Sequence, residues 1–316
     1  MPETLFPTDH PAFARLRGSD GGRAWVERLP ALVEEARTTW ALRIDPPFLS
    51  GSCSWTAPVR GANGEPAVLK IVWPHREARG EAAALRLWDG DGAVRLLAHA
   101  PERHTLLLER CLPGTELGAH EGQSAEERLL AACAVLRRLW EAGRRSGGPG
   151  LGGIERLTDV AEEWADLVEE RAGRLRTCEA DTGLFAHGAR LLRQLPRTAS
   201  EPALLHGDFN PGNLLAAARA PWLAIDAKPM LGDPAYDPWP LITQLGDPYA
   251  HRLPVTVLRA RTALAAEALG LDVARLRAWT LARQVEELLW AWEREQPRNR
   301  QEKLRRARVL ATVAEA

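Results

Sequence analysis

The chain has 316 residues, with 41 Lys and Arg against 42 Asp and Glu, which gives a formal net charge of -1. This balance excludes the broad basic field of a nucleic-acid-binding protein. Hydrophobic residues make up 45% and charged residues 26%, which is typical of a globular protein and excludes a disordered one. The first residues show no basic segment followed by an apolar run, and no stretch of about 18 apolar residues occurs, so we expect no membrane association.

The length suits two lobes that share a cleft, since domains usually have roughly 100–200 residues. Four cysteines stand at positions 53, 111, 133 and 178 without any C-x-x-C pair. A chain of this size does not need disulfides to fold, so we expect reduced thiols and a cytoplasmic location. We also expect a monomer.

Short apolar runs between turn signals occupy the first third of the chain. They predict strands at 67–72, 93–99 and 104–110. The segment 75–88, between the first two runs, is rich in Ala and Glu and predicts a helix.

The part after residue 120 is mostly helical in pattern. Residues 124–145 begin with Ser124 and Glu127, the spacing of a capping box, and continue with one apolar stripe. A Gly- and Pro-rich segment at 146–153 predicts a loop. Further helical patterns occur at 157–176, 183–195 and 276–292.

Strands followed by a largely helical half predict an α+β fold with two lobes. We expect the division near Leu112, where a Pro-Gly turn follows the last strand. The first lobe would be 1–111, including an N-terminal helical extension, and the second would be 112–316.

The most informative segments are ALLHGDFNPGNLLAA at 203–217 and PWLAIDAKPMLGDPAYD at 221–237. Two apolar strands there deliver Asp208, Asn213 and Asp226 to their ends. This triple suits phosphoryl transfer, because one carboxylate can orient a hydroxyl while an amide oxygen and a second carboxylate hold Mg²⁺. A simple strand-to-turn junction would not require all three residues.

In these segments the chain resembles the aminoglycoside phosphotransferases, relatives of the protein kinases. HGDFNPGN and IDAKP resemble their catalytic and metal-binding loops, and IDAKP with GDPAYD is similar to the streptomycin and hydroxyurea kinase branch. The resemblance runs from about 45 to about 240. It implies a two-lobed protein-kinase-like fold that binds ATP and Mg²⁺ between the lobes. It also implies that Asp208 is catalytic, Asn213 and Asp226 are magnesium ligands, and His206 is a structural residue of the loop.

Lys70 places a charge within the apolar run AVLKIV, which is costly unless its ammonium reaches an anion. The resemblance makes Lys70 the lysine that contacts the nucleotide phosphates and Glu81 its ion-pair partner. Glu77, one turn earlier, is the competing partner, and exposed surface positions are the alternative for both Lys70 and Glu81.

Two further segments are candidates for binding the nucleotide. The small residues of LSGSCSW, including Ser52 and Cys53, would let backbone N–H groups approach phosphate, although a plain hairpin turn is an equal alternative. The run LLLERCLPG resembles the kinase hinge, whose backbone at Glu109 and Cys111 would bond adenine. A buried strand that enters a turn would explain the same run without a nucleotide.

Three residues after the second strand have two interpretations each. Lys228 is predicted either to touch the transferred phosphate or to pair with a carboxylate. Asp237 resembles an acid that holds the catalytic loop through backbone N–H groups, and the alternative is an N-cap of the next helix. Asp233 is assigned to substrate binding or to support of the site.

The acceptor site is the least defined part of the sequence. Carboxylates and indole faces in this region would suit a cationic acceptor, although a Trp at helical spacing is usually a core residue. Glu286 and Glu287 are adjacent and cannot face the same way on a helix, so at most one lines the cleft. The candidates are Trp239, Asp247, Glu286, Glu287, Trp290 and Trp292.

These features and the resemblance to the aminoglycoside phosphotransferases together predict an ATP- and Mg²⁺-dependent kinase that transfers the γ-phosphate to a hydroxyl group of a small molecule, with an aminoglycoside of the streptomycin type as the first choice of acceptor. Hydroxyurea, an aminosugar or another metabolite are alternative acceptors. A catalytically silent nucleotide-binding protein and a metal-dependent hydrolase built on His206 are less well supported. The chain lacks the H-R-D and A-P-E motifs of a protein kinase.

Overall fold

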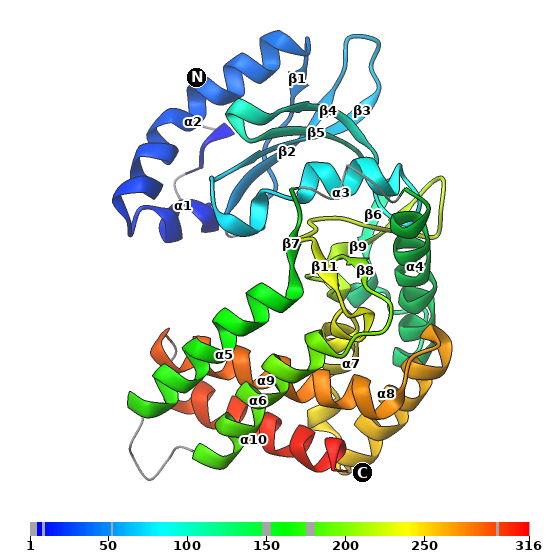
Figure 1. The fold of residues 1–316 in the computed structure, drawn as a ribbon. Coiled ribbons are helices and arrows are strands. Elements are labelled where there is room, and N and C mark those ends of the chain that lie inside the picture. Colours follow the sequence, from blue (N-terminus) through cyan, green and yellow to red (C-terminus); the bar gives the residue numbers. More distant parts are fainter. Residues whose placement is uncertain are drawn as a thin grey trace.

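The computed structural model describes residues 5–7, 10–51, 53–146, 153–174, 181–294 and 297–315, with the side chains of 290–294 and 297 set aside. A sheet with three helices is followed by a mainly helical lobe, so the predicted two-lobed α+β fold is confirmed (Figure 1). The sheet lobe contains α1 (Pro11–Leu16), α2 (Asp20–Thr39), β1 (Arg43–Ile44), β2 (Ser54–Arg60), β3 (Pro66–Val72), α3 (Glu81–Trp88), β4 (Leu96–Ala100) and β5 (Thr105–Glu109). It is followed by β6 (Pro113–Glu116), α4 (Ala125–Arg145), β7 (Glu155–Arg156), α5 (Leu157–Arg174), α6 (Thr182–Arg197), β8 (Ala203–Leu205), β9 (Leu214–Ala217), β10 (Trp222–Ala224), β11 (Met230–Gly232), α7 (Trp239–Gln244), α8 (Pro254–Leu269), α9 (Val273–Arg294) and α10 (Pro297–Ala314).

The sheet of the first lobe is antiparallel, with the strand order β1-β2-β3-β5-β4. Helices α1 and α2 cover it with a core that includes Phe13, Leu29 and Trp55. The predicted strands at 67–72 and 104–110 are confirmed as β3 and β5.

Two predictions in this lobe were inaccurate. The strand predicted at 93–99 begins only at Leu96, because Ala93 instead forms an isolated bridge with Ala224 of the second lobe. The helix predicted over 75–88 is divided into a short 3₁₀ turn and α3. Gly80 lies at this break, where a Cβ would come within 2.7 Å of a side-chain carbon of Pro229, so the chain here is shaped by a distant loop.

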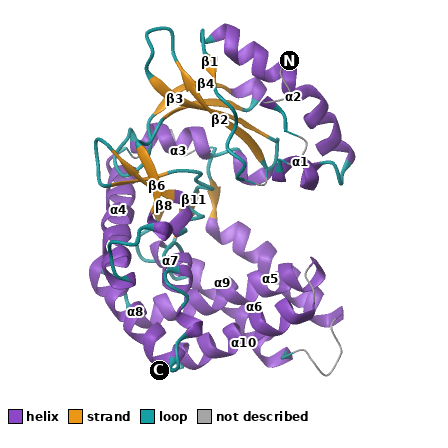
Figure 2. Cartoon of the chain, turned by 180° about the vertical axis from the view of Figure 1, so that it is seen from behind, coloured by secondary structure: helices purple, strands orange, loops and turns teal. Residues whose placement is uncertain are grey.

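The second lobe is built around α4 and a bundle of α5, α6, α9 and α10, which lie side by side at the end farthest from the sheet (Figure 2). The capping box at Ser124 and Glu127 is present at the start of α4. The predicted helices at 157–176, 183–195 and 276–292 correspond to α5, α6 and α9. Most of the predicted loop at 146–153 lies outside the described residues. None of the described helices is long and apolar enough to span a bilayer.

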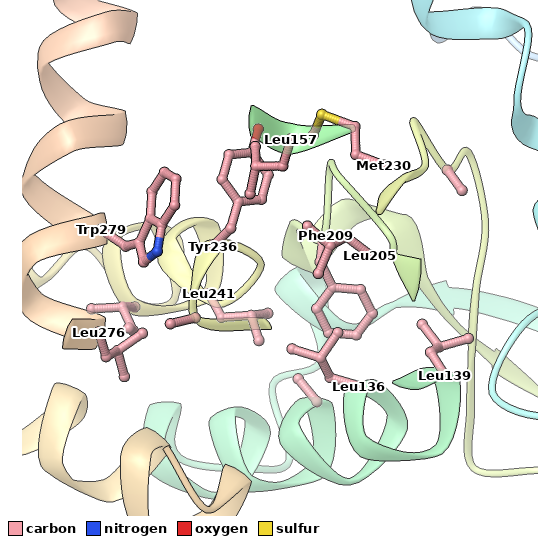
Figure 3. Close-up of a cluster of buried hydrophobic side chains, with 14 of the residues drawn as sticks. Leu136, Leu139, Leu157, Leu205, Phe209, Met230, Tyr236, Leu241, Leu276 and Trp279 are labelled. Atoms are coloured by element: carbon pink, nitrogen blue, oxygen red, sulfur yellow. The ribbon is translucent and has the colours of Figure 1, made fainter. Parts of the chain in front are cut away.

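The core of the second lobe lies directly under the candidate site. Leu136 and Leu139 of α4 point toward Leu205 and Phe209, and all four side chains are fully buried (Figure 3). Tyr236 packs edge-on against Trp279 of α9, with 5.4 Å between the ring centroids. This packing fixes the strands and turns from which the polar loops project.

Two small sheets, β10-β9-β6 and β7-β11-β8, lie between the large sheet and the helical bundle (Figure 1). Arg219, in the turn between β9 and β10, connects the sheet β10-β9-β6 to the first lobe. Its guanidinium donates to the carboxylate of Glu109 at 2.6 Å and to the carbonyl oxygens of Gly90 and Ala93 at 2.7 and 2.8 Å. A second connection joins Arg76, just before α3, to Glu155 and Glu163.

Candidate active site

The loop after β8 carries His206, Gly207 and Asp208. All three residues of β8 are buried, so the strand fixes where the loop begins. Gly207 has a φ of 82°, and a Cβ at this position would lie 1.9 Å from the carbonyl oxygen of Lys228. Because glycine has no Cβ, the loop that carries Asp208 can pass this close to the loop that carries Lys228.

Gly207→Ala should lower both stability and turnover. The left-handed backbone costs about 1–3 kcal/mol for a non-glycine residue, and the clash forces the Lys228 loop to move. Gly270→Ala is the matched control, since Gly270 has a φ of 68° but its Cβ would meet nothing within 4 Å. Thermal unfolding should show a clearly larger loss for Gly207→Ala, and equal losses would contradict the argument.

Asp237 holds the same loop through hydrogen bonds from the loop's backbone to its carboxylate. Its Oδ2 accepts hydrogen bonds from the backbone N–H of His206 at 3.0 Å and from Nε1 of Trp140 at 3.1 Å. Its Oδ1 accepts from the N–H of Gly207 at 2.9 Å. The alternative of a helix cap does not apply, because Pro238 is the N-cap of α7.

The imidazole of His206 is bonded to backbone on both sides. Nε2 is 3.0 Å from the carbonyl oxygen of Ile225, and Nδ1 accepts from the N–H of Asp208 at 3.3 Å. This pattern assigns the proton to Nε2. Burial lowers the pKa of His206, so the ring is neutral and ties the two loops together. Because both ring nitrogens are engaged by the backbone, His206 is not available as a metal ligand.

The carboxylate of Asp208 faces Lys228 and Asn210. Nζ of Lys228 lies 2.8 Å from Oδ2, and Nδ2 of Asn210 donates to Oδ1 at 3.1 Å. Burial opposes ionisation of Asp208, but Lys228 outweighs it, so the pKa of Asp208 is lowered and the carboxylate is charged at neutral pH. Of the two interpretations of Lys228, pairing with a carboxylate is therefore observed, and the carboxylate is that of Asp208.

Asn213 and Asp226 stand on neighbouring loops beside Asp208. Nδ2 of Asn213 donates to the carbonyl oxygen of Asp208 at 2.9 Å, which leaves the amide oxygen available for another partner. The carbonyl of Asn213 accepts from the N–H of Ile225 at 2.9 Å, so this loop is also bonded to the residue before Asp226. Asp226 has a φ of 56°, and its side chain is 48% exposed.

Lys70 of β3 lies between two carboxylates. Its Nζ is 2.6 Å from Oε2 of Glu81 and 2.6 Å from Oδ1 of Asp226, and only 6% of the Lys70 side chain is exposed. Burial alone would lower the pKa of Lys70, but Asp226 and Glu81 raise it above its usual value. Lys70 in turn lowers the pKa of Asp226 to about 2. Glu77 is not the partner of Lys70, since it faces Lys228 at 3.8 Å.

A cavity of about 460 Å³ between the lobes is lined by Lys70, Asn213 and Asp226. Glu109 and Cys111 line the same cavity. The Glu109 carboxylate is held by Arg219, as described above. Cys53 is not part of the lining, although its carbonyl accepts from the N–H of Trp73 at 2.9 Å. Ser52 lies outside the described residues.

A second cavity of about 320 Å³ opens on Asp208 from the helical lobe. Lys228 and Glu286 line it, together with Tyr236 and Trp164. Glu287 faces away and binds Nζ of Lys303 at 3.0 Å. Of the two adjacent glutamates, Glu286 lines this cavity and Glu287 does not.

The other candidates for the acceptor site lie elsewhere. Asp233 is 2% exposed and binds Arg275 at 2.7 Å as well as the indole of Trp279, so it stabilises the lobe without reaching Asp208. Trp239 is buried and packs against the guanidinium group of Arg283, and Asp247 caps the turn before α8. The side chains of Trp290 and Trp292 lie outside the described part of the chain.

Sequence reasoning missed Arg283, which also lines the second cavity. Arg283 begins the segment RQVEELLW, and an arginine among charged and apolar residues of this kind is usually expected on the surface of a helix. Its spacing of four residues from Trp279 and three from Glu286 is the one signal that places it on the face toward the cavity.

The chain matches a family model described as aminoglycoside/hydroxyurea antibiotic resistance kinase over residues 39–295. This range exceeds the expected 45–240 and includes every candidate from Lys70 to Glu286. A streptomycin 6-kinase of Streptomyces glaucescens is 39% identical over 282 residues, which cover 88% of each protein. A hydroxyurea phosphotransferase of Kitasatospora aureofaciens is also 39% identical, over 87% of this chain and 77% of the relative.

Solved structures agree on the fold at much lower identity. The choline kinase of Streptococcus pneumoniae superimposes with a TM-score of 0.61 at 12% identity, over 90% of this chain and 99% of the other. A GDP complex of aminoglycoside 2'-phosphotransferase-IIIa gives 0.56 at 14%, over 90% and 98%. With the two-lobed fold and the sequence matches, the chain belongs to the aminoglycoside/hydroxyurea antibiotic resistance kinase family.

Proposed function

We propose that this protein transfers the γ-phosphoryl group of ATP to a hydroxyl group of a small molecule, with an aminoglycoside of the streptomycin type as the leading acceptor. One observation carries the proposal. Asp208 lines the second cavity, and its backbone carbonyl accepts a hydrogen bond from Asn213. Asn213 in turn lines the cavity between the lobes. A base and a phosphate-binding site are thus joined by one loop.

The cavity between the lobes suits Mg²⁺ and ATP. Mg²⁺ takes oxygen ligands and is usually held by one or two protein groups, with phosphates and water completing its shell. The amide oxygen of Asn213 and the half-exposed carboxylate of Asp226 are groups of this kind. Lys70 would bind the α- and β-phosphates, while backbone groups of Glu109 and Cys111 would bind the base. Cys53 and Ser52 belong to the segment that we assign to the phosphates.

The chemistry assigned to this chain's own residues is mainly positioning. In phosphoryl transfer, the protein orients the nucleophile and stabilises spread negative charge. The ionised Asp208 accepts the hydrogen bond of the acceptor hydroxyl. It receives the proton as the new O–P bond forms and as the bond between the γ-phosphorus and the oxygen of the leaving ADP breaks. Lys228 keeps Asp208 charged and offers a cation toward the transferred group. Asp237 holds the loop, while bound Mg²⁺ would neutralise charge on the phosphates.

Hydroxyurea is the second acceptor that the observations favour. The relative that acts on it is as similar to this chain as the streptomycin kinase is. The lining of the second cavity is also balanced, with four basic and four acidic side chains, so it does not demand a polycation. These side chains are Arg76, Arg79, Lys228, Arg283, Glu77, Glu155, Asp208 and Glu286.

Three broader assignments belong to the same proposal. We place the division between the lobes near Leu112, where the large sheet has ended and β6 begins to pair with β9. The free thiols of Cys111 and Cys133 suit a reducing cytoplasm. We also propose that the protein is a monomer. The arrangement of Lys70, Asp208, Asn213 and Asp226 disfavours a catalytically silent protein.

The test is ATP-dependent release of ADP with streptomycin, other aminoglycosides, hydroxyurea and glucosamine, with the phosphorylated product identified by mass. We expect turnover with one acceptor class that requires Mg²⁺ and Asp208. Tight binding of Mg·ATP without transfer to any of these compounds would instead favour a different acceptor class or the silent protein.

A further inference from the structure

Arg283 and Glu286 are one turn apart on α9, and both line the cavity that opens on Asp208. Arg283 is 9% exposed, yet its Nε and Nη1 have no hydrogen-bond partner among the described residues. A buried guanidinium in this condition is rare, because each unmet donor costs free energy. The position therefore needs a reason beyond the packing of α9.

Aromatic rings hold the guanidinium in place. Its central carbon lies 4.0 Å from the ring centroid of Tyr236 and 4.7 Å from that of Trp239. Stacking of this kind fixes the plane of the group without using its N–H donors. Tyr236 is itself fixed by Trp279, next to it in Figure 3.

Glu286 offers the complementary group. No hydrogen bond or ion pair joins its carboxylate to another residue in the described ranges, and the structure contains no ion pair between Glu286 and Arg283. The other charged groups of this cavity are accounted for. Arg76 binds Glu155, Lys228 binds Asp208, and Arg79 is exposed to water.

We infer that Arg283 and Glu286 together select the acceptor, with Arg283 donating to an oxygen of the acceptor and Glu286 accepting from a nearby N–H group. The inference rests on the proposed function and names the chemistry of its substrate. Streptomycin, in which guanidinium groups stand beside hydroxyls, has this combination. Hydroxyurea has it as well, since its N–H groups stand beside a carbonyl. Simple sugars without nitrogen lack the N–H group and should bind poorly.

The test is equilibrium binding of streptomycin and of hydroxyurea, together with steady-state kinetics, for Arg283→Met, Glu286→Gln and the double variant. Met keeps an unbranched side chain against the rings but removes every donor. Loss of a hydrogen bond to a charged group should raise the Kd and KM of the acceptor about 10- to 100-fold. The KM for ATP should stay within about twofold. The double variant should lose less than the product of the two single effects, because both residues bind one molecule.

Matched controls lie on the same helix but face away from the cavity. Arg277 donates to Thr262 at 3.2 Å, and Glu287 binds Lys303, so Arg277→Met and Glu287→Gln should leave acceptor binding unchanged at pH 8, where Glu286 is ionised. If Arg283→Met does not fold, Arg283→Lys keeps the charge over the rings and removes the planar fork. Comparison of the Kd values for streptomycin and hydroxyurea then tells whether Arg283 and Glu286 recognise a guanidinium group or a urea-type nitrogen.

The pH dependence gives a second readout. Burial raises the pKa of Glu286 to about 7, while Arg283 opposes this rise and Glu287, Glu77 and Arg171 also act on the group. A guanidinium stays charged between pH 6 and pH 8, and Glu286 must be ionised to bind it. Affinity for streptomycin should therefore increase up to about tenfold over this range, and Glu286→Gln should abolish the increase.

Unchanged acceptor binding in both single variants, or strictly multiplicative effects, would overturn the inference. So would a wild-type protein that binds neither probe. Asp208-dependent turnover that is insensitive to Arg283 would refute this inference alone and leave the proposed function intact. Binding that depends on Arg283 and Glu286 but leads to no phosphate transfer would refute the function and leave the inference standing.

Discussion

Asp208→Ala should lower kcat about 10²- to 10⁴-fold, the range usually lost with a positioned acid or base, which corresponds to roughly 3–5 kcal/mol of activation free energy. The reason is local. Asp208 is the carboxylate that both lines the acceptor cavity and is kept ionised by Lys228 at 2.8 Å. The variant should still bind Mg·ATP, since Lys70 and Asp226 are untouched.

Asp247→Asn is the matched control for this experiment. Asp247 belongs to the same lobe and caps a turn, but it does not line the cavity, and Asn can replace it as a cap. Steady-state kinetics with the best acceptor should separate the two variants clearly. A kcat near the wild-type value for Asp208→Ala would remove Asp208 from the reaction.

Lys70→Met should destabilise the protein by about 3–5 kcal/mol, because it leaves the buried carboxylate of Glu81 without its cation. Glu81 is 2% exposed, and Asp226 contributes a second negative charge to the same ammonium. The double variant Lys70→Met/Glu81→Leu should recover most of this stability, since no uncompensated charge remains in the core. It should not recover the affinity for ATP.

Denaturant unfolding and nucleotide binding, measured on the same samples, test both statements. Lys303→Met is the control, since the Lys303–Glu287 pair is more exposed and such pairs contribute about 0–1 kcal/mol. If the double variant bound ATP as tightly as the wild type, Lys70 would be a structural residue only.

The local chemistry of the sequence predicted the polar loops well. HGDFNPGN and IDAKP follow apolar strands, and strand ends are where such residues gather, so the proximity of Asp208, Asn213 and Asp226 could be predicted. The charge of Lys70 within an apolar strand also required a partner. These features depend on neighbours in the chain or on one expensive buried charge.

Features that depend on distant packing could not be predicted in this way. The helix expected at 75–88 is divided where Gly80 meets Pro229, about 150 positions later in the chain. Arg283 has the sequence surroundings of a surface residue, and only the rings of Tyr236 and Trp239 show why it is buried. Asp233 follows the site motif closely, yet its carboxylate turns toward Arg275.

The contacts of Arg219 determine how the lobes can separate. This residue ties the turn between β9 and β10 to Glu109, Gly90 and Ala93, so the two lobes are pinned at that edge. With this edge held, separation of the two lobes requires the sheet lobe to rotate about the contacts of Arg219, and the displacement of its residues grows with their distance from Arg219. It is greatest near α1, on the opposite side of the sheet lobe from β6 (Figure 1). Such a swing must also break the ion pairs that join Arg76 to Glu155 and Glu163 and the one that joins Lys70 to Asp226, so these contacts set how far the sheet lobe can move.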